Sequence, residues 1–229
     1  MRYVSTTEAA RLLREGRVGL VPTETVVGLV AGETGLPRLF GIKGRDPDKP
    51  IALLCDSAQE AFDRSREVPP LARFLAERFW PGPLTLVLDA QEDGTVGVRV
   101  PAHPVARSVL AGYGGPLYAT SANPSGGPAP RALQEVDPAV RAAADFAVWG
   151  EPGRGEASAV VDFSGGKVRV LRPTAELTEE RLSRLATEAV EGGLASPEGG
   201  ERFEGAPGSV YTLPDRTRGE SPARVETNR

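Results

Sequence analysis

One segment places two cations close together in a way that suits an anionic ligand. Lys43-Gly44-Arg45 has a lysine and an arginine on either side of a glycine. A lysine supplies a point charge, an arginine supplies a planar fork, and a glycine allows the backbone to approach a ligand closely, so a polyphosphate would fit. The chain has only three lysines, and two of them, Lys43 and Lys49, lie here. The alternative is a solvated loop paired with Asp46 and Asp48.

Polar residues also follow two apolar segments that are expected to be buried strands. Thr23, within Pro22-Thr23-Glu24-Thr25, follows residues 17–21, while Ser121 and Asn123 follow residues 117–120. Polar groups at strand ends commonly line the crevice of an open α/β sheet. Ser121 and Asn123 point to the same side of an extended chain and could read a base or hold a phosphate. The alternatives are a capping turn and an Asx-turn, and each is favoured when its segment is considered alone.

A further pair of polar residues lies at strand ends nearer the C-terminus. Ser158 precedes an apolar segment, 159–163, and Arg172 ends another, 168–171. Either side chain could face a crevice, although single polar residues at strand ends are more often structural. The remaining distinctive residues, His103, Cys55, Trp80 and Trp149, are interpreted as a turn residue, an inert core thiol and two packing aromatics.

The elements that must position these residues alternate along the chain. Helices are expected over 6–16, 36–42, 57–66, 70–80, 104–111, 137–144 and 178–190. Strands are expected over 17–21, 51–55, 84–88, 96–100, 117–120, 146–149, 159–163 and 168–171. This alternation predicts an α/β fold with helices packed on a twisted mixed sheet.

Composition limits the function further. The 229 residues carry a net charge of −4, with one cysteine and one histidine, which excludes a disulfide framework and cysteine- or histidine-rich metal sites. The chain contains none of the usual phosphate-loop, dinucleotide or hydrolase-elbow motifs. No apolar run of about 18 residues and no signal peptide occur, so we expect a cytoplasmic protein without a membrane partner.

The character of the sequence changes near residue 190. Residues 1–190 read as one domain, and residues 191–229 are rich in glycine and proline with few large apolar side chains. We therefore expect a flexible C-terminal tail with one possible docking segment at residues 209–213.

Taken together and in order, these segments resemble the YrdC-like family of threonylcarbamoyl-AMP synthases, in a short single-domain form. The resemblance covers about residues 5–190. It rests on Pro22-Thr23-Glu24-Thr25, Lys43-Gly44-Arg45, Trp80-Pro81-Gly82-Pro83-Leu84-Thr85, Val98-Arg99-Val100-Pro101-Ala102-His103-Pro104, Thr120-Ser121-Ala122-Asn123, Ser158 to Asp162 and Leu171-Arg172-Pro173.

The resemblance implies a large, locally positive cavity and a reaction in which L-threonine, bicarbonate and ATP form threonylcarbamoyl-AMP and pyrophosphate. A partner transferase would then modify tRNA, and direct contact with tRNA is possible. Lys43 and Arg45 would act on the triphosphate and serve as the catalytic residues. Ser121, Asn123, Ser158 and Arg172 would bind ATP, and Thr23 and Arg99 would bind threonine. Mg²⁺ would be held mainly by ATP, with no protein metal site.

Departures from the family pattern leave other interpretations open. Val27 stands where many members carry an aromatic residue, Lys49 where some carry a histidine, and Ala159 where a threonine is common. The main alternative is a non-catalytic RNA- or nucleotide-binding protein of the same family. A carbamoyl-transfer domain like that of hydrogenase-maturation proteins is a further alternative, although the additional regions of those long chains do not fit here.

Overall fold

The structure, a computed structural model, describes residues 1–44, 51–193, 202–204, 209–212 and 226–227. Its helices are α1 (Thr6–Arg14), α2 (Leu36–Lys43), α3 (Ala58–Phe62), α4 (Pro70–Phe79), α5 (Pro104–Tyr113), α6 (Pro138–Ala143) and α7 (Glu179–Glu191). Its strands are β1 (Tyr3–Val4), β2 (Val18–Pro22), β3 (Val27–Ala31), β4 (Ala52–Leu54), β5 (Leu84–Asp89), β6 (Thr95–Arg99), β7 (Leu117–Ser121), β8 (Phe146–Val148), β9 (Ala159–Asp162), β10 (Lys167–Arg172), β11 (Arg202–Glu204), β12 (Ser209–Thr212) and β13 (Glu226–Thr227).

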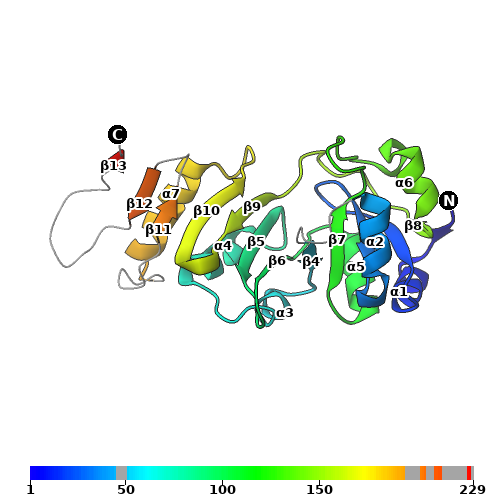
Figure 1. Cartoon of the computed structure of the whole chain (residues 1–229), viewed down its shortest axis with the longest axis horizontal. Helices are drawn as coiled ribbons and strands as arrows, with labels where there is room; N and C mark the ends of the chain where they lie inside the picture. The colour runs from blue at the N-terminus through cyan, green and yellow to red at the C-terminus, as the bar shows by residue number, and fades with distance from the viewer. Residues whose placement is uncertain (45–50, 194–201, 205–208, 213–225, 228–229) are drawn as a thin grey trace.

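The strands form one sheet in the order β1-β8-β2-β3-β7-β4-β6-β5-β9-β10-β11-β12-β13. Parallel pairs such as β4 with β6 and β5 with β9 alternate with antiparallel pairs such as β3 with β7 and β9 with β10. The sheet runs along the long axis of the molecule, with helices beside it (Figure 1). This architecture confirms the predicted α/β fold with a twisted mixed sheet and flanking helices.

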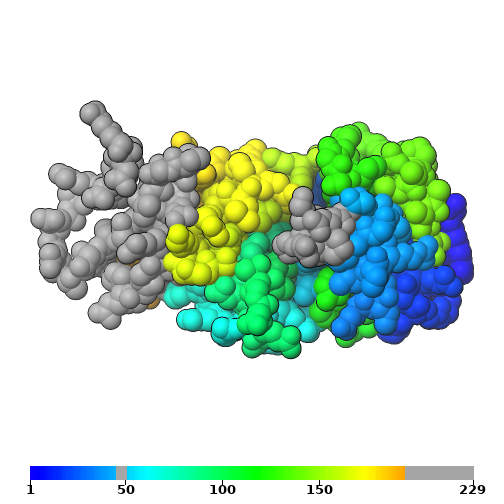
Figure 2. Space-filling view, viewed as in Figure 1, coloured from blue at the N-terminus to red at the C-terminus, as the bar shows by residue number. Residues whose placement is uncertain are grey.

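The N-terminal half of the sheet is covered on both faces. Residues of β2 and β3 alternate between two clusters of buried side chains, as the period of a strand requires. Leu20 and Leu29 pack with α2 and α6, whereas Val21 and Val30 pack with α1 and α5. This half is therefore a three-layer arrangement, and it occupies the blue and green end of the body in Figure 2.

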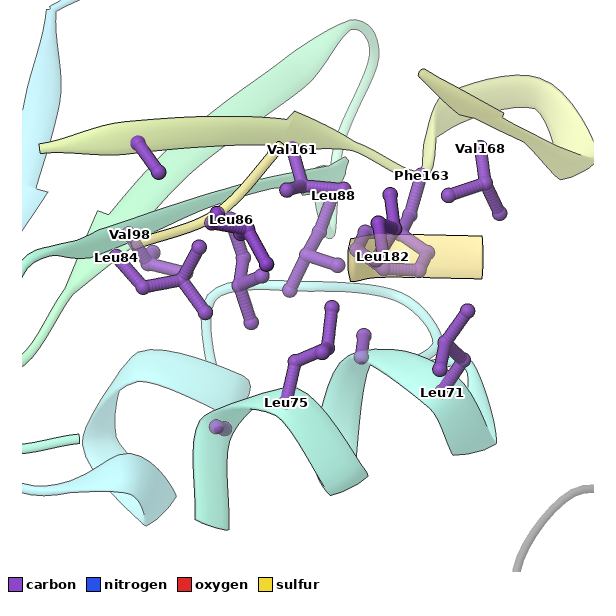
Figure 3. Close-up of a cluster of buried hydrophobic side chains, with 14 of the residues drawn as sticks. Leu71, Leu75, Leu84, Leu86, Leu88, Val98, Val161, Phe163, Val168 and Leu182 are labelled. Carbon is purple, nitrogen blue, oxygen red and sulfur yellow. The ribbon is translucent and has the colours of Figure 1, made fainter. Parts of the chain in front are cut away.

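The other half of the sheet has a helical layer on one face. Leu84, Leu86 and Leu88 of β5 point toward α4 and α7, where they meet Leu75 and Leu182 (Figure 3). All of these leucines are almost fully buried. Because successive residues of a strand point to opposite faces, the intervening residues of β5 must face away from this core.

Most of the predicted elements are present. Strand β3 was not predicted, and α3 is shorter than the expected helix. Trp149 is 62% exposed and packs edge-on against Tyr3, with ring centroids 6.4 Å apart, so it is a packing aromatic but not a core residue. In the region expected to be a tail, the described residues form β11, β12 and β13, with β11 pairing in parallel with β10. The division at residue 190 stays a prediction. None of the helices in the described ranges is long and apolar enough to cross a membrane.

Candidate functional site

A cavity of about 460 Å³ lies against the sheet face opposite the α4–α7 layer. Alternation along the strands explains part of the lining: Thr85 of β5 and Arg99 of β6 face the cavity, while the residues on either side of each enter the core. Ser158, just before β9, also lines the cavity. Its apolar lining includes Ile51, Ala52, Leu54, Val87, Ala119 and Val160. Apolar walls with a few convergent polar groups are typical of a small-molecule site, and the volume is in the usual range.

Lys43 lies at the C-terminal end of α2 and is 5% exposed. Its Nζ donates to the carbonyl oxygens of Ser121 and Asn123, both at 2.7 Å, to Ser121 Oγ at 3.1 Å and to Asn123 Oδ1 at 2.8 Å. This ammonium group therefore ties the C-terminal end of α2 to the end of β7 and the residues just after it. Ser121 and Asn123 face the same side, as their spacing predicts.

Thr85, Ser158 and Arg172 form a second hydrogen-bonded cluster of side chains in the cavity lining. Thr85 Oγ1 lies 2.9 Å from Ser158 Oγ, and Arg172 donates from Nε to the Ser158 carbonyl at 2.7 Å and from Nη2 to Ser158 Oγ at 3.2 Å. Burial and the nearby charge of Arg99 lower the pKa of Arg172. The two guanidinium groups thus line the same cavity.

Arg99 is 7% exposed and has a carboxylate partner. Its Nη2 donates to Glu24 Oε1 at 2.5 Å and to Thr25 Oγ1 at 3.0 Å, and its Nε donates to the Gly82 carbonyl at 3.1 Å. Burial raises the pKa of Glu24, but the charge and hydrogen bond of Arg99 outweigh burial and hold it below its usual value. Glu24 is therefore ionised at neutral pH.

The segment Thr23 to Val26 is the hairpin turn between β2 and β3. Thr23 Oγ1 donates to the Val26 carbonyl at 2.6 Å and accepts from the backbone N–H groups of Thr25 and Val26. It also lies 2.9 Å from Thr25 Oγ1. Because the single hydroxyl proton of Thr23 is used on Val26, Thr25 must donate in that contact. The Thr23 hydroxyl is thus satisfied within the turn.

A glycine-containing segment covers this turn from outside. The backbone N–H groups of Arg154 and Gly155 donate to the carbonyls of Glu24 at 3.0 Å and Thr25 at 2.8 Å. A Cβ on Gly153 would lie less than 3.0 Å from the carbonyl oxygens of Thr23 and Thr25. Only a glycine lets the two segments approach this closely. The same segment then supplies Ala157 and Ser158 to the cavity.

The structure brings most of the predicted site residues together. Seven of the eight line the cavity: Thr23, Lys43, Arg99, Ser121, Asn123, Ser158 and Arg172. The eighth, Arg45, lies outside the described residues. His103, read as a turn residue, caps α5 through its Nδ1, which accepts from Val105 N at 3.1 Å. Cys55 is buried, and burial raises the pKa of its thiol to about 12.

Sequence reasoning assigned no role to Glu24, Thr25 or Thr85. Each acts through a partner distant in sequence: Glu24 and Arg99 are 75 residues apart, and Thr85 and Ser158 are 73 apart. Their positions next to predicted site residues could have indicated a role, since Glu24 and Thr25 belong to the segment Pro22-Thr23-Glu24-Thr25. In the described part of the chain, no aspartate or glutamate lines the cavity and no cluster of metal-ligating side chains occurs.

A continuous mixed sheet with a cation-lined cavity midway along it defines an α/β protein built to hold an anionic small molecule. Residues 11–174 match the sequence model of the Sua5/YciO/YrdC family, which is described as "Telomere recombination". The chain belongs to this family, as the resemblance predicted.

Individual relatives and solved structures agree with this assignment. A threonylcarbamoyl-AMP synthase of Pyrococcus abyssi is 37% identical over 178 residues, which are 72% of this chain and 52% of that protein. A putative threonylcarbamoyl-AMP synthase of Mycobacterium tuberculosis is 34% identical over 196 residues, covering 79% of this chain and 89% of that protein. The crystal structure of P. abyssi Sua5 complexed with L-threonine superposes with a TM-score of 0.72 at 35% identity, covering 79% of this chain and 56% of that one.

The matched relatives differ in length. This chain spans 52% of the P. abyssi protein, and 41% of a Bacillus subtilis threonylcarbamoyl-AMP synthase that is 37% identical over 142 residues. It spans 96% of a Pseudomonas fluorescens threonylcarbamoyl-AMP synthase that is 34% identical over 180 residues.

Proposed function

We propose that this protein joins L-threonine, bicarbonate and ATP into threonylcarbamoyl-AMP and pyrophosphate. The observation that carries the proposal is the convergence of Lys43, Arg99 and Arg172 on one cavity, together with the hydroxyl and amide groups of Ser121, Asn123 and Ser158. The names of the relatives, and the L-threonine bound to one of them, support the same activity.

In the proposed reaction the threonine amine first attacks bicarbonate, forming a carbamate and releasing water. A carbamate oxygen then attacks the α-phosphorus of ATP, and the bond from that phosphorus to the bridging oxygen breaks, so pyrophosphate leaves. No described residue lining the cavity is needed as a covalent nucleophile. Lys43 and Arg172 instead offset the charge that develops on the leaving pyrophosphate, and the cavity holds the reactants in place.

We assign the two ends of the cavity to different parts of the substrates. Arg99, held by the β2–β3 turn, offers a guanidinium to the threonine carboxylate. Lys43, Ser121, Asn123, Ser158 and Arg172 lie toward the nucleotide, with Arg45 joining them by the family resemblance. Thr23 shapes the threonine end by building the turn, since its hydroxyl is already satisfied there.

Mg²⁺ enters this scheme as part of the substrate MgATP. The described cavity lining offers hydroxyl, amide and carbonyl oxygens but no carboxylate, whereas the triphosphate supplies the anionic oxygens that Mg²⁺ prefers. The adenylate would then pass to a transferase that modifies tRNA in the cytoplasm.

Pyrophosphate release by the purified chain tests the proposal. Protein with MgATP receives L-threonine and bicarbonate singly and then together, and we expect release only when both are present. Lys167→Ala, on an exposed part of β10 outside the cavity lining, is the control for Lys43→Ala. ATP binding without threonine-dependent release would instead favour the nucleotide- or RNA-binding alternative.

A further inference from the structure

The guanidinium of Arg99 has one nitrogen left for a ligand. Nε and Nη2 donate to Gly82, Glu24 and Thr25, as described above. Nη1 has no hydrogen-bond partner among the residues that the structure describes, and Arg99 lines the cavity. The two N–H groups of Nη1 are therefore those that Arg99 can offer to a bound molecule.

Glu24 fixes this arrangement from behind. Its Oε1 accepts from Arg99, and its Oε2 accepts from the backbone N–H of His103 at 3.2 Å, at the start of α5. Glu24 itself does not line the cavity. Arg99 cannot adopt another orientation in the cavity without breaking its ion pair with Glu24. The two side chains of this pair are 8% and 15% exposed, and breaking a pair buried to this extent is costly.

The cavity's other arginine is compensated differently. Within the described part of the chain, the acceptors of Arg172 are the carbonyl and hydroxyl oxygens of Ser158, which are neutral. Within the described ranges, no aspartate or glutamate forms an ion pair with it. The two arginines therefore differ in local charge: Arg99 and Glu24 form a pair with no net charge, whereas no such carboxylate balances the charge of Arg172.

We propose that Glu24 determines which ligand group Arg99 accepts, by fixing its orientation and making the ion pair neutral overall. A neutral pair that presents two N–H groups favours a planar, singly charged carboxylate, which gains directional hydrogen bonds. A multiply charged phosphate gains more from the uncancelled charge of Arg172. Glu24 is thus a positioning and specificity residue that acts through Arg99. This inference rests on the proposed function, because it takes the carboxylate to be that of threonine.

The first test compares Glu24→Gln with a matched control. Glutamine keeps the shape and one acceptor but removes the charge. Asp145→Asn is the control, because Asp145 also pairs with an arginine, Arg38, and accepts from a backbone N–H, that of Val18 at 2.9 Å. It is 19% exposed and lies outside the cavity lining.

Calorimetric titration of the full chain gives affinities without requiring turnover. For E24Q we expect L-threonine to bind about tenfold more weakly, or ~1.4 kcal/mol, with MgATP affinity within about threefold of wild type. For D145N we expect both affinities to stay near those of wild type. The KM for threonine should rise in the same proportion in E24Q while the KM for ATP does not.

Competition by inorganic phosphate separates specificity from simple loss of structure. In E24Q the charge of Arg99 is no longer cancelled, so phosphate should compete with threonine, whereas in wild type it should not. A merely loosened turn would weaken threonine binding without creating a phosphate site.

Glu24→Asp is the second variant and carries the test if E24Q does not fold. Aspartate keeps the charge but is one methylene shorter, so threonine should bind more weakly without phosphate competition. The inference is overturned if the folded variants bind threonine like wild type, or if D145N weakens it as much. If the variants give such a result while wild type still binds threonine and turns it over, this inference alone is rejected. A wild-type chain that neither binds threonine nor releases pyrophosphate would reject the proposed function itself.

Discussion

Four oxygens of one short segment accept from the Lys43 ammonium, two from Ser121 and two from Asn123. Removing the ammonium in Lys43→Ala takes away a cation that the proposed reaction needs at the triphosphate. We expect pyrophosphate release to fall about a hundredfold or more, with the fold intact by circular dichroism. Lys167→Ala should retain activity. By the family resemblance, Arg45→Ala should lose activity as Lys43→Ala does, and near-normal turnover in both would discredit the phosphate assignment.

Thr85 was not predicted from the sequence, but its hydroxyl contacts Ser158 Oγ, which in turn accepts from Arg172. Thr85→Val replaces that hydroxyl with a methyl group of similar size. We expect the KM for ATP to rise about fivefold and the free energy of unfolding to fall by ~1 kcal/mol, because Ser158 loses a partner in a buried place. Thr187→Val is the control, since Thr187 is an exposed residue of α7 and its hydroxyl donates to the Ser183 carbonyl of the same helix. Equal KM values in the two variants would remove Thr85 from the site.

Residue types account for how much of the site was predictable. Charged and hydroxyl side chains in the order and spacing of a family motif indicated Lys43, Ser121 and Arg172, and the structure places them together. Glu24 carried no comparable signal, because its role depends on Arg99, which reaches it only after β6 and the β2–β3 turn have met. Side-chain pairs of this kind are set by tertiary packing and cannot be read from local spacing.

At the scale of elements, apolar runs bounded by proline and glycine indicated most strands, but β3 was not predicted. Residues 22–25 were interpreted as a polar segment that follows a strand, and no element was expected over the apolar run 27–31. The structure shows a tight antiparallel hairpin, with Pro22 opposite Val27. The turn, which holds Thr23 and Thr25 at the cavity, is thereby fixed by strands on both sides.

The close approach of the segment around Gly153 to this hairpin leads to a prediction for two glycines. Gly153→Ala should push the turn inward, because the new Cβ meets two carbonyl oxygens that cannot move independently. We expect a lower thermal midpoint and a weaker affinity for threonine. Gly41→Ala has nothing within 4 Å of its Cβ and lies inside α2. It should raise the free energy of unfolding by about 0.5–1 kcal/mol. A harmless Gly153→Ala would show that the turn does not depend on this contact.

At the scale of the whole molecule, the site exists because the sheet is covered unequally. The N-terminal half has helices on both faces. The adjoining strands β4, β6, β5, β9 and β10 have the α4–α7 layer on one face and the cavity on the other. The sequence predicted the elements and the mixed sheet. It could not show this difference in coverage, because helical periodicity does not say which face of the sheet a helix will cover.

The same arrangement leaves partly buried ion pairs whose titration affects the stability of the entire chain. The pKa values of Glu24 and Asp145 both lie below their ordinary values in the folded protein, because arginines and backbone N–H groups outweigh burial. Both groups therefore bind fewer protons when folded, so their stabilising contribution is complete above the ordinary pKa and is lost as pH falls. For Glu24 that loss begins below about pH 4.5.

Urea unfolding of wild type and E24Q from neutral pH to about pH 3 measures this contribution directly. At neutral pH wild type should be the more stable, because E24Q leaves Arg99 buried without its carboxylate. As Glu24 becomes protonated in wild type, it comes to resemble glutamine, and the difference between the two free energies of unfolding should shrink. A difference that stays constant over the whole range would mean that the charge of Glu24 contributes nothing to the fold, and that its carboxylate acts only through shape.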